Sequence, residues 1–107
     1  MREARTEAAI SDNWPVPPEI VRRRLRVHGR VQGVFYRDST RERARREGVS
    51  GWAKNCADGT VEVVLEGPEP AVSSVAAFCE VGPPHASVRD VDMRAEEPQG
   101  LSGFEIR

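Results

Sequence analysis

The chain contains few cysteine and aromatic residues and no long apolar run, and each of these features excludes a class of protein. Of its 107 residues, two are cysteine and six are aromatic (two Trp, one Tyr and three Phe). Cys56 and Cys79 lie far apart without a CxxC spacing, so we expect two reduced thiols and neither a disulfide framework nor a zinc site. The absence of any long apolar run predicts neither a secretion signal nor a membrane span, and the expected compartment is the cytoplasm.

Net charge is also nearly absent. The chain has 16 Lys and Arg residues against 17 Asp and Glu residues, which argues against a protein held on nucleic acid by a net positive field. RNA-binding domains often stack bases on aromatic residues of central strands. The predicted strands around residues 21–27 and 60–66 contain no aromatic residue, so nucleic acid is not an expected partner. Because the chain has no long apolar run, a membrane is not an expected partner either.

The sequence also lacks the common nucleotide-binding motifs. The pattern GxxxxGK[ST] is absent, which leaves nucleoside triphosphate binding unsupported. The pattern GxGxxG is absent as well, which removes a dinucleotide site.

The chain divides into a short tail and one domain. Residues 1–19 are rich in charged residues and contain Pro15, Pro17 and Pro18, which end any helix that begins before them. We therefore predict a disordered or loosely docked tail over 1–19, with Trp14 as the candidate residue for pinning it to the domain, and a single domain over 20–107.

Within that domain, strand and helix patterns alternate. Alternating apolar residues predict strands at 20–28, 49–57, 60–66 and 88–96, with a short pairing segment at 104–106. Helices are predicted at 37–47 and after Pro68 and Pro70. The order β-α-β-β-α-β favours a sandwich of one four-stranded antiparallel sheet with two helices on one face. In such a sheet we expect the second strand at an edge, beside the third.

One segment has the composition of an anion-binding loop. It reads Gly29-Arg-Val-Gln-Gly-Val-Phe-Tyr-Arg37 and lies between the first strand and the first helix. Gly29 and Gly33 can turn backbone N–H groups inward, and the helix that follows adds its positive N-terminal end. Arg37 can place a planar guanidinium on two phosphate oxygens. A cysteine phosphatase would need a thiol six positions earlier, where Val31 stands; by glycine spacing alone, a plain turn remains the simpler reading of the segment.

A second segment makes a functional site the better interpretation. Gly51-Trp-Ala-Lys-Asn55 ends the second predicted strand, just before the turn at Asp58-Gly59. The amide of Asn55 has one acceptor and two donors and does not titrate near neutral pH. This suits the positioning of a water molecule rather than the removal of its proton.

Together the two segments resemble the signatures of the acylphosphatase family. Asp58-Gly59-Thr-Val-Glu62, Glu66-Gly-Pro68 and the segment 82–88 also resemble the family's hairpin, strand end and second-helix exit, so the resemblance covers about 21–107. It departs from the family at Glu47, where a leucine is usual, and in the tail, which has no counterpart.

The resemblance implies a ferredoxin-like α/β (α+β) sandwich and the hydrolysis of acyl phosphates without a metal or another cofactor. It implies that Arg37 binds the phosphate, that Asn55 holds the attacking water, and that the loop backbone forms the cradle. The cradle residues are Gln32, Gly33, Val34, Phe35, Tyr36 and Arg37.

A small-molecule acyl phosphate is therefore the expected partner, with inorganic phosphate as product inhibitor, and the expected state is a monomer. Three alternatives stay open: a non-catalytic phosphate- or nucleic-acid-binding module, an accessory domain acting on carbamoyl phosphate, and a phosphate sensor with an inactive site. The acyl group of the substrate and the acceptor of the water's proton also stay open.

Overall fold

A computed structural model of the protein describes residues 18–107. The predicted tail lies almost wholly outside these residues, as does Trp14, and both stay predictions. The described chain forms two helices and five strands: β1 (Ile20–Arg30), α2 (Tyr36–Glu47), β2 (Ser50–Asn55), β3 (Val61–Pro68), α3 (Glu69–Cys79), β4 (Ser87–Glu96) and β5 (Phe104–Ile106).

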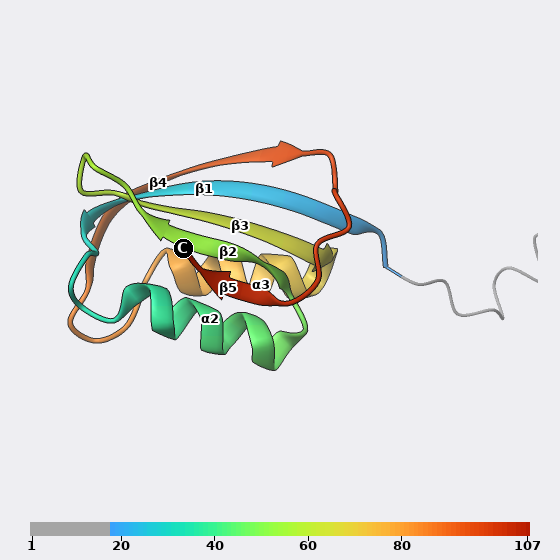
Figure 1. The fold of residues 1–107 in the computed structure, drawn as a ribbon, viewed down its shortest axis with the longest axis horizontal. Helices are drawn as coiled ribbons and strands as arrows, with labels where there is room; N and C mark the ends of the chain where they lie inside the picture. The colour runs from blue at the N-terminus through green and yellow to red at the C-terminus, as the bar shows by residue number, and fades with distance from the viewer. Residues whose placement is uncertain (1–17) are drawn as a thin grey trace, which may run out of the picture.

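The strands form one sheet in the order β4-β1-β3-β2-β5 (Figure 1). Strand β1 runs antiparallel to β3 and β4, and β2 runs antiparallel to β3. Strand β5 is parallel to β2 and pairs Phe104 and Ile106 with Gly51 and Ala53. The ferredoxin-like α+β fold is thus confirmed, but two details of the prediction are wrong. The sheet has five strands rather than four antiparallel ones, and β2 lies inside it because β5 covers its outer edge.

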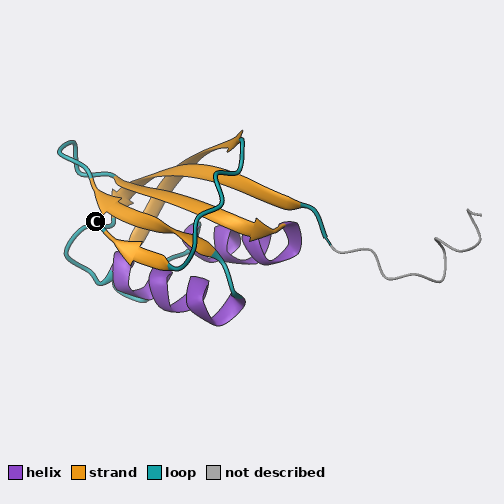
Figure 2. Cartoon of the chain, turned by 45° about the vertical axis from the view of Figure 1, so that its right-hand side comes forward, coloured by secondary structure: helices purple, strands orange, loops and turns teal. Residues whose placement is uncertain are grey.

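Both helices pack on the same face of the sheet (Figure 2). The core between the layers is built from the inward-facing residues of the strands, such as Leu25, Val63 and Leu65, and from Val72 and Val75 of α3. Helix α2 has a thin apolar stripe, as its sequence predicts, and buries Tyr36, Thr40 and Ala44. The Tyr36 hydroxyl donates a hydrogen bond of 2.6 Å to the backbone oxygen of Cys79, which joins the start of α2 to the end of α3.

The opposite face of the sheet carries a network of ion pairs. Arg22 on β1 is almost fully buried and donates to Glu66 on β3 at 2.8 Å and to Glu96 on β4 at 2.9 Å. Glu66 also accepts hydrogen bonds from the backbone N–H groups of Gln99 and Leu101. These bonds hold the segment between β4 and β5 against the sheet, which directs the chain back to β2.

Candidate active site

The loop between β1 and α2 is shaped by two residues in the left-handed backbone region. Gly33 has φ 75° and Phe35 has φ 62°. Phe35 is the residue before the first helical turn, and its side chain does not cap the helix. The N–H groups of the first turn of α2 therefore keep their capacity to donate toward the loop.

Gly29 serves a different purpose from the one predicted. It belongs to β1, next to an irregularity in the β1–β4 register, and has φ 127°. A Cβ at this position would lie 2.2 Å from the backbone oxygen of Ser87. Gly29 therefore allows β4 to approach β1, while Gly33 is the loop glycine that lines the pocket.

A hollow of about 260 Å³ opens beneath the loop. Its lining residues are Val31, Gly33, Phe35, Tyr36, Arg37, Asp38 and Asn55. Sites for drug-sized ligands run from roughly 300 to 1,000 Å³, so this volume suits a small molecule. Gln32 and Val34, also predicted for the cradle, are absent from the lining; the Val34 side chain packs in the core.

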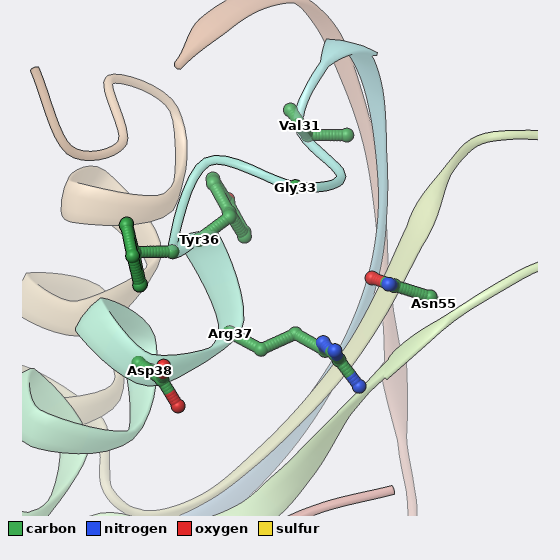
Figure 3. A pocket seen from close by; sticks show the side chains of 7 residues that line it. Val31, Gly33, Tyr36, Arg37, Asp38 and Asn55 are labelled. Atoms are coloured by element: carbon green, nitrogen blue, oxygen red, sulfur yellow. The ribbon is translucent and has the colours of Figure 1, made fainter. Parts of the chain in front are cut away.

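The two residues singled out from the sequence meet in this hollow. Figure 3 shows the Arg37 side chain extending from the first turn of α2 toward β2, and the Asn55 amide pointing back toward the loop. Arg37 Nη1 donates to the backbone oxygen of Arg107 at 3.0 Å. Within residues 18–107 no carboxylate side chain pairs with Arg37, so its charge is available to an anion in the hollow.

Asn55 supplies an acceptor on the opposite wall. It is the last residue of β2 and pairs with Val61 across the hairpin. Its Oδ1 atom is buried and accepts no hydrogen bond from any residue of the described chain. Leaving a buried acceptor unpaired costs about 1–3 kcal/mol, so such an atom at a pocket wall indicates a place for a donor from a bound molecule.

Gln32 connects the loop to the hairpin that follows Asn55. Its Nε2 atom donates to the backbone oxygens of Cys56 at 2.8 Å and Thr60 at 2.9 Å. The sequence indicated a backbone role for Gln32 and missed this side-chain role, because the bond depends on how close the hairpin comes to the loop. No local pattern at Gln32 signals it.

The hairpin turn is held by a second set of bonds. Asp58 accepts from the Thr60 N–H at 3.1 Å and from the Thr60 hydroxyl at 2.6 Å. These hydrogen bonds lower the pKa of the Asp58 carboxyl, with a smaller contribution from Arg26. The carboxylate therefore stays ionised at neutral pH and accepts both hydrogen bonds across the turn that follows Asn55.

The titratable side chains around the hollow do not form an acid–base pair. Burial raises the pKa of the Tyr36 phenol, and its hydroxyl is already bonded to Cys79, so it stays neutral. Asp38 also lines the hollow, but it is exposed and its carboxylate lies 3.5 Å from the guanidinium of Arg41. The walls thus offer a cation, backbone N–H groups and a neutral amide.

Within residues 18–107, no three His, Cys, Asp or Glu side chains gather closely enough to hold a metal ion. No helix in this part of the chain is long and apolar enough to cross a membrane.

Comparison with known proteins identifies the family. A sequence model of the Acylphosphatase family matches residues 23–106. The chain belongs to the acylphosphatase family. It is similar to a protein named acylphosphatase from Haloquadratum walsbyi, with 57% identity over 81 residues that cover 76% of this chain and 87% of the relative. A second acylphosphatase, from Rubrobacter xylanophilus, is 57% identical over 86 residues, covering 78% and 77%.

A solved structure of an acylphosphatase has the same fold as this chain. The crystal structure of acylphosphatase from Bacillus subtilis superposes with a TM-score of 0.79 at 35% identity, covering 81% of this chain and 98% of that one. The family predicted from the two sequence signatures is thus confirmed, and with it the assignment of the chain as an enzyme, an acylphosphatase.

Proposed function

We propose that the hollow formed by Arg37, Asn55 and the β1–α2 loop hydrolyses the carboxyl–phosphate bond of acyl phosphates to a carboxylate and inorganic phosphate. One observation carries this proposal: an arginine that pairs with no Asp or Glu side chain among residues 18–107 and an asparagine with a buried, unpaired amide oxygen line the same small hollow. The first attracts the phosphoryl group and the second accepts a hydrogen bond from water.

Arg37 and the loop bind the phosphoryl oxygens. The guanidinium can contact two oxygens at once and keeps its charge at every physiological pH. The uncapped N–H groups at the start of α2 donate to the same oxygens. Phosphoryl transfer passes through a loose transition state with charge spread over these oxygens, so fixed donors stabilise it.

Asn55 orients the attacking water. Its Oδ1 accepts one O–H of the water and directs the lone pair of the water oxygen toward phosphorus, in line with the leaving carboxylate. The P–O bond to the acyl group breaks as the bond to water forms. A phosphoryl oxygen of the substrate takes the proton from the water, which balances the step without a protein base.

The choice of substrate follows from the lack of a general acid in the site. A carboxylate leaves at low pKa and needs no general acid. Of the titratable side chains that line the hollow, Tyr36 is neutral and bonded to Cys79, and Asp38 is exposed and lies beside Arg41, so we assign neither of them the role of a general acid. A phosphate ester, whose alkoxide needs a proton, would not be hydrolysed at a useful rate here.

The proposed reaction also bears on product inhibition, and we add proposals for the oligomeric state and the cellular compartment. The released phosphate fits the same donors, so it inhibits as product. The proposed site needs no residue beyond those of this chain, and we propose a monomer as the acting unit. We place the enzyme in the cytoplasm, in keeping with Cys56 and Cys79 as free thiols.

The test is hydrolysis of acetyl phosphate in the presence of EDTA. We expect turnover by the wild type, by Arg46→Ala as an exposed-arginine control on the same helix, and almost none by Arg37→Ala or Asn55→Ala. A wild type that binds inorganic phosphate but never hydrolyses acetyl phosphate would favour the non-catalytic binding module instead.

A further inference from the structure

Strand β5 is short and lies at the edge of the sheet. It consists of Phe104–Ile106, whereas about five or six residues are usual for a strand. In the described chain it pairs with β2 alone. The Phe104 side chain is buried in the core, whereas residues 105–107 are half-buried or exposed. The segment after Phe104 therefore depends on contacts outside the core for its position.

Two arginines of α2 donate hydrogen bonds to the two ends of this segment. Arg45 Nη2 donates to the backbone oxygen of Phe104 at 3.2 Å, and Arg37 Nη1 donates to that of Arg107 at 3.0 Å. The helix rises roughly 12 Å between Arg37 and Arg45, and the extended chain from Phe104 to Arg107 spans roughly 10 Å. The two lengths match, so the helix, which lies beside β5 in Figure 1, can hold both ends of the segment at once.

The backbone oxygen of Arg107 matters to the proposed reaction because it anchors the guanidinium of Arg37. An arginine side chain has five N–H donors, so one bond to Arg107 leaves the others for the phosphoryl oxygens. Arg107 is itself fixed, because its N–H donates to the Ala53 oxygen at 2.8 Å and its guanidinium carbon lies 4.7 Å from the centre of the Trp52 ring. A fixed acceptor holds the Arg37 guanidinium in one orientation before the substrate binds, which favours an in-line attack.

Arg45 differs from its neighbour Arg46 in what it contacts. Both lie in the last turn of α2, where a cation complements the negative end of the helix. Arg46 lies 3.8 Å from the carboxylate of Glu42 on the same helix. Arg45 pairs with no Asp or Glu side chain among residues 18–107, and its bond reaches across to Phe104. A role at the helix end applies to both arginines, so the bond to β5 is the feature specific to Arg45.

We propose that Arg45 is a positioning residue for the reaction. It holds the start of β5 against α2, and β5 in turn places the Arg107 backbone oxygen where that atom orients Arg37. This inference rests on the proposed function and adds a residue that acts on the hollow without lining it. Without the bond to Phe104, β5 can shift away from α2, and the Arg37 guanidinium then leaves the orientation that meets the phosphoryl oxygens.

The test replaces Arg45 by methionine, which keeps the helix propensity and removes the donor. We expect kcat/KM for acetyl phosphate to fall about three- to tenfold, in the lower part of the range for residues that share a hydrogen-bond network. The inhibition constant of inorganic phosphate should rise by a similar factor, because Arg37 binds both ligands. Arg46→Met, the matched control, should change neither value, and Arg45→Lys, which keeps a donor, should recover part of both losses.

A nuclear magnetic resonance measurement separates the orientation of Arg37 from overall stability. Rotation of its guanidinium about the Nε–Cζ bond is slowed while Nη1 is bonded to Arg107, and a lower global stability alone leaves this rotation unchanged in the folded enzyme. We expect faster rotation in Arg45→Met and the wild-type rate in Arg46→Met. The Arg37 signal is assigned from its absence in Arg37→Lys.

The outcomes distinguish this inference from the proposed function. An active wild type whose Arg45→Met variant matches Arg46→Met in rotation rate and phosphate inhibition overturns the inference and leaves the proposed function standing. A wild type inactive on acetyl phosphate overturns the proposed function, and this inference with it. Should Arg45→Met not fold, Arg45→Gln, whose shorter side chain cannot reach Phe104, takes its place in every comparison.

Discussion

Gln32 and Cys56 are joined by a hydrogen bond of 2.8 Å from the side-chain amide of one to the backbone oxygen of the other. The same amide reaches Thr60 at 2.9 Å. One side chain of the β1–α2 loop thus bonds to both ends of the turn that follows Asn55, and it ties the loop to the hairpin that carries the proposed water-binding amide.

We predict that Gln32→Met lowers kcat about ten- to a hundredfold, because a small misplacement of Asn55 is enough to slow an in-line attack. Inhibition by inorganic phosphate should change little, since Arg37 and the loop backbone remain. Steady-state kinetics with acetyl phosphate measure both. Gln99→Met is the matched control, because only the backbone of Gln99 is bonded; an equal loss in that variant would contradict the role given to Gln32.

Replacing Arg37 by lysine should abolish almost as much turnover as replacing it by alanine. Lysine keeps the positive charge but presents one point instead of a planar fork. The loss of one well-placed donor costs about 10²–10³ in rate, and Arg37→Lys should lose at least that in kcat/KM. Retention of most of the activity in Arg37→Lys would show that charge alone binds the phosphoryl group.

Asn55→Ala separates water positioning from phosphate binding. We expect kcat to fall about 10²–10³-fold, whereas the inhibition constant for inorganic phosphate stays close to that of the wild type. The two are measured in one competition assay. Should phosphate binding disappear together with turnover, Asn55 would belong to the phosphate cradle instead.

The sequence predicted the order of the elements and the shared location of Arg37 and Asn55, because these depend on local periodicity and on two short signatures. It did not predict that β5 adds in parallel beside β2, since three residues carry too weak a pattern to show which strand they pair with. Nor did it reveal the Gln32 side-chain bonds, which join segments that approach each other only in the folded chain.

Gly29 is another residue whose role the sequence did not reveal, and its position in the structure leads to a prediction. Its place in the signature suggested a role in the cradle, yet it lies against β4. Gly29→Ala should lower the free energy of unfolding by about 2–4 kcal/mol, through overpacking and backbone strain. Gly33→Ala, with no atom within 4 Å of the new Cβ, should cost only about 1–2 kcal/mol but weaken phosphate inhibition. Urea unfolding and inhibition assays on both variants test this; a Gly33→Ala as unstable as Gly29→Ala would contradict it.

The ion pairs on the open face of the sheet make stability depend on pH. Hydrogen bonds from Arg24 at 2.7 Å and Arg22 at 2.9 Å lower the pKa of Glu96 from 4.5 to about 2. Because the folded-state pKa lies below the unfolded one, this stabilisation is complete above about pH 5 and is lost as pH falls toward 2. Glu66 acts in the same direction, since its hydrogen bonds to backbone N–H groups and to Arg22 outweigh the effect of burial and lower its pKa.

Urea unfolding at several pH values between neutral and about 3 checks this prediction. The unfolding midpoint should fall with pH in the wild type and fall less steeply in Glu96→Gln. Glu97→Gln, an exposed neighbour, is the control and should follow the wild type. Identical slopes in wild type and Glu96→Gln would show that other carboxylates cause the acid sensitivity.

Strand β5 has a consequence for the order in which the enzyme is made. It closes the outer edge of β2, and Arg107, just after it, accepts the hydrogen bond from Arg37. Arg37 and Asn55 leave the ribosome well before these residues do. Until residues 104–107 emerge, the outer edge of β2 is unpaired and Arg37 lacks its hydrogen bond to Arg107. Pairing across so many residues is slow compared with helix formation, so the site should be completed late, and a nascent chain stalled before β5 should carry both signatures without activity.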